Sequence, residues 1–388
     1  MTRDLRTTLI HHPYRPPEGF DAPQVAVHKA STVFFPNVAA LRARDWRHKD
    51  GYTYGLHGTP TTFVLEERIA TLEGGKHCAL VPSGLAAIAL VDYALLSAGD
   101  EVLLPANVYG PSKELARAQL ARLGITHRFY DPLDAAATAA MITPATKLLW
   151  LEAPGSVTME FPDLKGIAAA ARARGVTIAI DNTWGAGLAL NGFDAGADIV
   201  MQALTKFPSG GGDVLMGSVV TRDDALAERI KMAHMHMGWG VAANDAELLL
   251  RSLPSMALRY RAADETARTL AQWLSTRPEV ARVLHPAMPS CPGHEHWRAH
   301  CTQAAGLFSI VLQPHHGTAQ VDAFCDALRL FKLGYSWAGP VSLVVPYDLR
   351  AMRGTPPFDG GLVRFSIGLE LAADLQADLA QALQALAG

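Results

Sequence analysis

The feature that most constrains the fold of this chain is an alternation of apolar runs with helix-forming segments between residues 77 and 204. The strand candidates are short and apolar: 77–82, 101–105, 146–154, 176–181 and 197–204. Helix candidates occupy three of the intervals: 83–100, 111–124 and 163–175. Apolar strands that alternate with helices are typical of an α/β fold, with a mainly parallel sheet covered on both faces.

The chain has 388 residues, which is longer than one ordinary core requires. Residues 1–50 carry several prolines and no long periodic pattern, so we expect an N-terminal arm. The alternating region predicts a large α/β domain over 51–245. Beyond it, helical stretches and strand candidates at 306–313 and 361–370 predict a smaller C-terminal α+β domain over 246–388.

The amino-acid composition gives no reason to expect a nucleic-acid-binding, membrane or secreted protein. Hydrophobic residues make up 49% and charged residues 18%, as in ordinary globular proteins. A net charge of −3 gives no electrostatic reason to expect nucleic acid or an anionic membrane as a partner. The first twenty residues lack the apolar core of a signal peptide, and the four cysteines are scattered, which favours a reduced, cytoplasmic protein.

Small or polar residues directly follow several of the predicted strands. In open parallel sheets, ligands bind beyond the carboxyl ends of the strands, so we expect these residues to converge on one crevice. They are Ser83 and Gly84, Tyr109, Asp181, and Thr205 with Lys206.

The chemistry of these residues is complementary. A helix that begins at Ser83 and Gly84 offers free N–H groups to a phosphate, and Thr205 adds a hydroxyl donor. Tyr109 offers a flat face for a ring, and Asp181 a negative charge for a ring nitrogen. The Lys206 amine can bond to an aldehyde. Pyridoxal 5′-phosphate (PLP) matches all of these features.

Each residue also has an ordinary structural interpretation. Asp181 can simply turn the chain, Tyr109 can be a packed surface ring, and Ser83 is a natural N-cap. Lys206 can be a solvated loop lysine. Their joint placement at successive strand ends favours the PLP interpretation over four independent coincidences.

Longer motifs resemble the Cys/Met-metabolism family of PLP enzymes, of fold type I, the aspartate aminotransferase fold. The likeness covers nearly the whole chain and includes "AIDNTW", "QALTKF", "YGLHGTPTTFVLEERIATLEGG", "VPSGLAAI" and "LVRFSIGLE". Within that family, "EAPGSVTME" and "YSWAG" resemble the bacterial β-lyase branch. The resemblance implies PLP-dependent cleavage of cystathionine to homocysteine, pyruvate and ammonia, in methionine biosynthesis and transsulfuration. It also implies a homotetramer, a dimer of dimers with shared active sites.

The resemblance further implies a role for each matching residue. Lys206 holds the cofactor, Asp181 pairs with its ring nitrogen, and Tyr109 stacks on its ring. The implied phosphate ligands are Ser83, Gly84, Leu85 and Thr205, with Tyr54 reaching the site of a neighbouring subunit. Arg364 is implied to bind the substrate α-carboxylate, beside Ser336 and Trp337.

Two positions depart from the family pattern. Leu56, followed by His57, stands where the family usually has a phosphate-binding arginine, and Ala203 stands where many members have a serine. We therefore expect the phosphate to depend more on the helix end, or on His57, and the cofactor to bind more weakly than is usual in the family.

The sequence also contains a segment that could suggest a metal site, and it leaves two other functions open. The segment "CPGHEHWRAHC" (291–301) contains metal-ligand residue types, but Arg298 breaks the HExxH pattern, so we expect no metal. A γ-acting lyase or synthase of the same family is the nearest alternative function. A catalytically silent binding protein is a second, which the retained Lys206, Asp181 and Arg364 disfavour.

Overall fold

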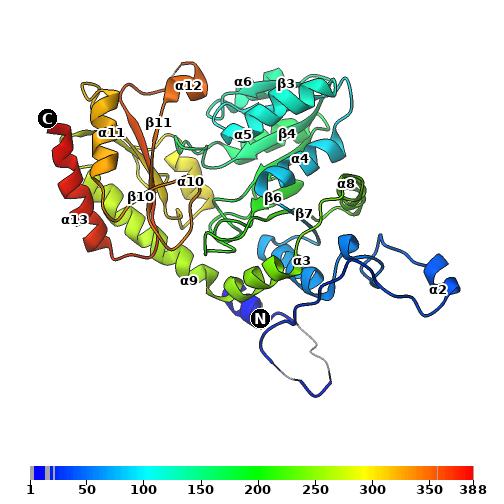
Figure 1. The fold of residues 1–388 in the computed structure, drawn as a ribbon. Helices are drawn as coiled ribbons and strands as arrows, with labels where there is room; N and C mark the ends of the chain where they lie inside the picture. The colour runs from blue at the N-terminus through cyan, green and yellow to red at the C-terminus, as the bar shows by residue number, and fades with distance from the viewer. Residues whose placement is uncertain (1–3, 14–17, 21, 356, 388) are drawn as a thin grey trace.

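The computed structural model describes residues 4–13, 18–20, 22–355 and 357–387, and a long helix joins its two β-sheets (Figure 1). The first sheet has seven strands in the order β1-β7-β6-β5-β4-β2-β3. Their bounds are β1 His77–Val81, β2 Glu101–Pro105, β3 Thr126–Tyr130, β4 Thr146–Glu152, β5 Thr177–Asp181, β6 Ile199–Ala203 and β7 Gly217–Thr221. Neighbouring strands pair in parallel except β7, which is antiparallel to β1 and β6. The predicted mainly parallel sheet is therefore confirmed.

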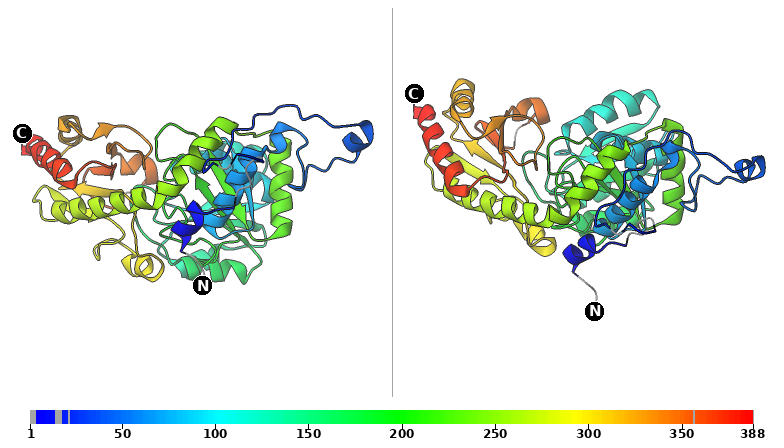
Figure 2. Two further views of the ribbon diagram at one scale, coloured as in Figure 1. Left: turned by 90° about the horizontal axis from the view of Figure 1, so that it is seen from below. Right: turned by 60° about the horizontal axis from the view of Figure 1, so that its bottom comes forward.

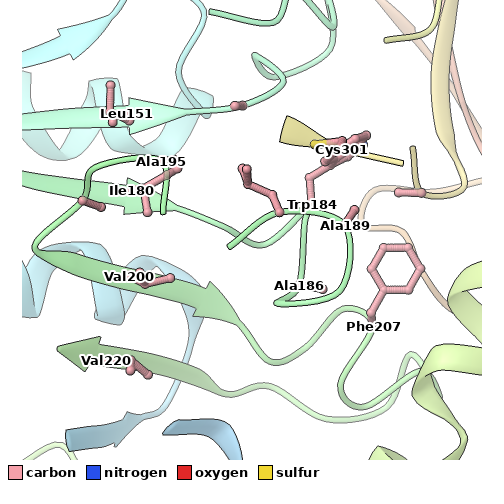
Figure 3. Close-up of a cluster of buried hydrophobic side chains, with 14 of the residues drawn as sticks. Leu151, Ile180, Trp184, Ala186, Ala189, Ala195, Val200, Phe207, Val220 and Cys301 are labelled. Atoms are coloured by element: carbon pink, nitrogen blue, oxygen red, sulfur yellow. The ribbon is translucent and has the colours of Figure 1, made fainter. Parts of the chain in front are cut away.

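Both faces of this sheet are covered. Successive side chains of a strand point to opposite faces, and here they pack into two different cores. On β4, Leu149 and Leu151 pack into one core, and Leu148 and Trp150 into the other. The first core includes α3 (Pro60–Glu73) and α7 (Leu164–Arg172); the second includes α4 (Gly84–Leu95) and α8 (Asp224–Met237). Figure 3 shows the first core, where Leu151, Ile180, Val200 and Val220 come from four neighbouring strands.

The second sheet has five strands in the order β10-β11-β12-β9-β8, and α9 (Ala243–Leu274) leads to it from the first sheet. The strands are β8 Val280–Leu284, β9 Leu307–Leu312, β10 Lys332–Leu333, β11 Leu343–Tyr347 and β12 Leu362–Ser366. The helices of this region are α10 His294–His300, α11 Thr318–Ala327, α12 Leu349–Arg353 and α13 Ala372–Ala382, followed by a short 3-10 turn, η3 Leu383–Ala387. The predicted boundary near residue 245 falls at the start of α9, and the division into domains there stays a prediction.

The N-terminal segment carries α1 (Leu5–Ile10), α2 (Val38–Arg42) and a 3-10 turn, η1 (Gly55–His57). Leu9 of α1 is buried in the first core. The part that carries α2 reaches away from the rest of the molecule in every view (Figures 1 and 2).

Some elements differ from the sequence expectations. Strands β3 and β7 were not predicted: β3 is a polar edge strand, and β7 begins with a glycine. The helix predicted over 111–124 forms as α5 (Gly110–Glu114) and then a π-helical turn, η2 (Leu115–Leu120). No helix in the described part of the chain is long and apolar enough to cross a membrane.

Candidate functional site

A cavity of about 550 Å³ lies where the carboxyl ends of the parallel strands face the second sheet. Ten of the eleven predicted site residues line it: Ser83, Gly84, Leu85, Tyr109, Asp181, Thr205, Lys206, Ser336, Trp337 and Arg364. They come from both sheets, so the cavity depends on how the two sheets pack together. Tyr54 is the predicted residue that does not line it.

Lys206 lies in the turn that follows β6, and its neighbour Phe207 anchors this turn. Phe207 is buried against Tyr260 of α9, with ring centroids 4.5 Å apart. The Tyr260 hydroxyl donates to the Trp184 carbonyl at 3.0 Å, so the turn is fixed to the core shown in Figure 3.

The amine of Lys206 is held in the cavity and donates from Nζ to Ser336 Oγ at 2.5 Å. Burial, together with the nearby charge of Arg364, lowers the pKa of Lys206 to about 8, and Asp181 opposes this shift. A lysine with such a pKa is partly neutral near physiological pH. It can therefore act as a nucleophile or a base, which an ordinary surface lysine does poorly.

Asp181 ends β5 and points its carboxylate into the same cavity. Its Oδ1 accepts hydrogen bonds from Thr183 N at 2.9 Å and from Thr183 Oγ1 at 2.5 Å. Burial raises the pKa of Asp181, and these two hydrogen bonds oppose that rise. The threonine hydroxyl also accepts from Ala203 N at 2.9 Å, which ties the carboxylate to β6.

The first turn of α4 lines the cavity, at the place where a phosphate is predicted to bind. Ser83 caps the helix by accepting from Ala86 N at 3.1 Å, while the other N–H groups of the first turn lack helical partners. A Cβ on Gly84 would lie 2.6 Å from the Ala203 Cβ, so glycine is required for this close approach. The Thr205 hydroxyl donates to the Met216 carbonyl at 3.2 Å, and its predicted role towards a phosphate stays a prediction.

Tyr109 precedes α5, and its backbone N–H donates to Glu152 Oε2 at 2.8 Å. The side chain lines the cavity and is 43% exposed, so one side of it is available to a bound molecule. Burial raises the pKa of the Tyr109 hydroxyl, with the charge of Asp181 adding to the shift.

The second sheet contributes a guanidinium. Arg364 on β12 is only 7% exposed, and its Nη2 donates to the Ser336 carbonyl at 3.2 Å. Its Nε has no hydrogen-bond partner among the described residues. Ser336 and Ala338 have positive φ angles of 78° and 67°, which is uncommon for residues other than glycine and typical of functional loops. Arg364 thus places in the cavity a guanidinium, a group suited to binding a carboxylate.

Tyr54 lies on the arm, with its ring centroid 5.9 Å from that of His57. His57 Nδ1 lies 2.6 Å from Thr53 Oγ1. Leu56 and His57 line a larger cavity of about 830 Å³, together with Lys231 and His234. This second cavity contains neither Lys206 nor Arg364, so we assign the chemistry to the smaller one. The predicted roles of Tyr54 and His57 concern a neighbouring subunit and stay predictions.

The sequence interpretation missed several cavity residues, among them Glu152, Tyr347 and Met352. Glu152 ends β4, so the strand-end rule that found Asp181 applies to it as well. Tyr347 and Met352 come from the second sheet region, where no local pattern marks them.

The segment 291–301 contains α10, and two of its potential metal ligands contact protein carbonyls. Cys291 Sγ donates to the Met159 carbonyl at 3.3 Å, and His294 Nδ1 lies 2.9 Å from the Pro286 carbonyl. Across the residues that the structure describes, no three His, Cys, Asp or Glu side chains are grouped to hold a metal ion.

The donor set around the smaller cavity fits PLP. Lys206 supplies a partly neutral amine for the aldehyde, and Asp181 a carboxylate for the ring nitrogen. The first turn of α4, left open by Gly84, supplies N–H groups for the phosphate.

The chain is similar in sequence to PLP-dependent enzymes. The family profile described as Cys/Met metabolism PLP-dependent enzyme matches residues 6–384. A putative cystathionine beta-lyase of Rhizobium johnstonii is 42% identical, covering 93% of this chain and 90% of that protein. Cystathionine beta-lyase MetC of Escherichia coli is 37% identical, covering 91% of each. Among solved structures, metB from Corynebacterium glutamicum superposes with a TM-score of 0.91 at 28% identity, covering 99% of each chain.

Proposed function

The chain belongs to the Cys/Met metabolism family of PLP-dependent enzymes, and on that premise we propose that it is a cystathionine β-lyase. The reaction is β-elimination from L-cystathionine, which yields homocysteine, pyruvate and ammonia. One observation supports it most directly: a partly neutral lysine, a half-buried carboxylate and a largely buried guanidinium line one cavity. Those are the groups that a carbon–sulfur lyase of this kind requires.

The roles follow from the geometry. PLP, when bound, withdraws electrons from the substrate Cα and makes loss of its proton feasible. Lys206, with a pKa of about 8, takes that proton on its free amine. Asp181 keeps the ring nitrogen protonated, because a neighbouring negative charge favours the charged form.

Two further residues orient the substrate and the ring. Arg364 binds the α-carboxylate through its guanidinium, whose planar fork can make two parallel hydrogen bonds. Tyr109 would pack its ring against the bound cofactor. Ser336 accepts a hydrogen bond from Lys206 through its hydroxyl and one from Arg364 through its carbonyl, so it fixes the position of the base relative to the carboxylate site.

A γ-acting lyase or synthase is the alternative within the family, since it would use the same lysine, carboxylate and arginine. Product analysis with L-cystathionine separates the two. Pyruvate with homocysteine is the expected result, whereas 2-oxobutyrate with cysteine would overturn the assignment in favour of γ-cleavage.

We also propose a cytoplasmic homotetramer, built from dimers with shared active sites. The support is the arm: Phe34 is 92% exposed, and Val38 and Tyr54 are exposed as well, so a second copy could cover them. The four buried cysteines are free thiols, as suits a reducing compartment. Sedimentation analysis of the purified protein tests the assembly, and a monomer would contradict it.

A further inference from the structure

Helix α12 lies in the chain between two strands that each contribute a side chain to the cavity. It connects β11, which carries Tyr347, to β12, which carries Arg364. Met352 on α12 lines the cavity, whereas its neighbour Arg353 points elsewhere and does not. The position of this helix therefore determines one wall of the site.

Arg353 forms a buried, bidentate ion pair with Glu160, which belongs to the segment that follows β4. Nη1 donates to Oε1 at 2.9 Å and Nη2 to Oε2 at 3.1 Å, and the two side chains are 12% and 5% exposed. Nη2 also donates to Thr158 Oγ1. Two parallel hydrogen bonds fix the orientation of a guanidinium as well as its distance.

The contact continues from Glu160 to the loop that carries Tyr109. Glu160 Oε2 accepts from Asn107 Nδ2 at 3.0 Å, and the Asn107 carbonyl accepts from Ser156 N at 2.8 Å. A Cβ on Gly155 would lie 1.7 Å from Asn107 Nδ2, so glycine is needed for the amide to pass. Asn107 is two residues before Tyr109. We call Arg353, Glu160, Thr158 and Asn107 the clasp.

Lys113 makes a second connection between the same two parts. It is 8% exposed, and its Nζ donates to the Ala106 carbonyl at 2.6 Å and to the Met352 carbonyl at 3.1 Å. The Tyr109 loop is therefore tied to α12 on both of its sides, through Asn107 and through Lys113.

The segment held by the clasp is strained. Val157 and Met159 have positive φ angles of 70° and 60°, and a β-branched residue such as valine seldom adopts this conformation. Both residues line the cavity. Strained backbone persists only where surrounding contacts hold it, and Glu160 directly follows this segment.

We propose that the clasp positions the cavity walls for the reaction, so that Arg353 and Glu160 are positioning residues although neither lines the cavity. The clasp sets the spacing between the Tyr109 loop, the strained 157–159 segment and Met352. If the ion pair only stabilised the fold, replacing both charged groups by neutral groups of similar size would leave kcat unchanged. Such a double replacement is often harmless to stability as well. The activity part of the test rests on the proposed lyase function.

The test compares the holoenzyme with four variants. Arg353→Met combined with Glu160→Gln removes both charges without leaving either buried and unpaired. Arg353→Lys keeps the charge but cannot make the bidentate contact. Lys113→Met breaks the second connection. Arg350→Met is the matched control, on the same helix but exposed. For each protein, the kcat and KM for pyruvate release from L-cystathionine, the visible circular dichroism of the bound cofactor and Tm are measured.

We expect the double variant to keep its Tm while kcat falls roughly 10- to 100-fold, because small misplacements of reacting groups are costly. KM should change by less than about threefold, since Arg364 is untouched. The cofactor dichroism should fall as Tyr109 shifts. Arg353→Lys and Lys113→Met should each lower kcat about 3- to 10-fold, and Arg350→Met should match the wild type.

Wild-type kcat and dichroism in the double variant, or in Arg353→Lys if the double variant does not fold, would overturn the proposal. The failure of the proposed function is a separate outcome. If the wild type released no pyruvate from cystathionine, the dichroism of the variants would still decide whether the clasp positions Tyr109.

Discussion

Glu152 and Asp181 are register partners at the carboxyl ends of the neighbouring parallel strands β4 and β5, and both line the cavity. Two carboxyl groups so placed, largely shielded from water, cannot both be charged without a large penalty. Thr183 donates twice to Asp181, whereas burial, reinforced by the charge of Asp181, raises the pKa of Glu152 well above its usual value. We infer that the pair carries one negative charge, on Asp181, and one proton, on Glu152.

Glu152→Gln should therefore be nearly silent. The amide is neutral, as the protonated acid is, and its oxygen can still accept from the Tyr109 N–H. We expect kcat and cofactor affinity to stay within about threefold of the wild type. A loss of a hundredfold or more would show that the reaction needs a charge on Glu152.

Asp181→Asn should behave in the opposite way. The cavity keeps its shape, but the ring nitrogen loses the anion that holds its proton. We expect the variant to bind PLP and to lose roughly three or more orders of magnitude in kcat. Steady-state kinetics with cofactor-saturated protein checks this, and near-normal turnover would remove Asp181 from the mechanism.

Lys206 should control cofactor capture through its ionisation. Only the neutral amine attacks an aldehyde, so the capture rate by cofactor-free protein should rise with pH through about 8 and then level off. Because the charge of Arg364 helps to lower the pKa of Lys206, Arg364→Met should move this midpoint to higher pH. Stopped-flow absorbance measures the rate of cofactor capture by the wild type and by Arg364→Met across this pH range.

Lys206→Ala should show no covalent capture of the cofactor and no turnover, and retention of either would exclude the role assigned to Lys206.

Asp92 offers a test of stability against pH. It is buried in α4, accepts from Trp150 Nε1 at 2.9 Å, and burial raises its pKa to about 7. The folded chain then keeps a proton that the unfolded chain releases, so this group lowers stability as pH rises from about 4 to about 7. Asp92→Asn retains the acceptor and removes the penalty.

We expect the Asp92→Asn variant to gain about 4 kcal/mol over the wild type at pH 8 relative to pH 4, because the pKa of Asp92 is raised by about three units. Urea denaturation at the two pH values measures the difference. Asp322→Asn, on the exposed face of α11, is the control and should show no such gain. An equal gain at both pH values would mean that Asp92 does not hold a proton in the folded protein.

Ala203→Ser should tighten cofactor binding. Ala203 lies against the first turn of α4, so a hydroxyl at this position would add a donor where the phosphate is expected. One hydrogen bond to a charged group contributes about 1.5–3 kcal/mol, so the Kd for PLP should fall by roughly tenfold or more. Equilibrium dialysis checks this, and an unchanged Kd would place the phosphate elsewhere.

The sequence predicted the half of the site that local patterns encode. Asp181 and Lys206 were found because Asp181 ends a buried strand and Lys206 closely follows one, and parallel strands bring such ends together. Glu152 was missed although it obeys the same rule, because the strand was extended to residue 154 and so hid its true end.

The remainder depends on contacts between distant parts of the chain. Arg364, Ser336 and Trp337 were predicted only through family resemblance, since their approach to Lys206 results from the packing of two sheets. The left-handed conformation of Ser336 has no local signature, because it occurs at a residue other than glycine. The clasp has the same origin, with Arg353 and Glu160 meeting across the two parts of the fold.

The contribution of Lys206 and Arg364 by different sheets has a consequence for how this enzyme matures. During synthesis, Lys206 leaves the ribosome long before Arg364. The pocket is therefore complete only after the last strands have been made and have packed against the earlier part of the chain.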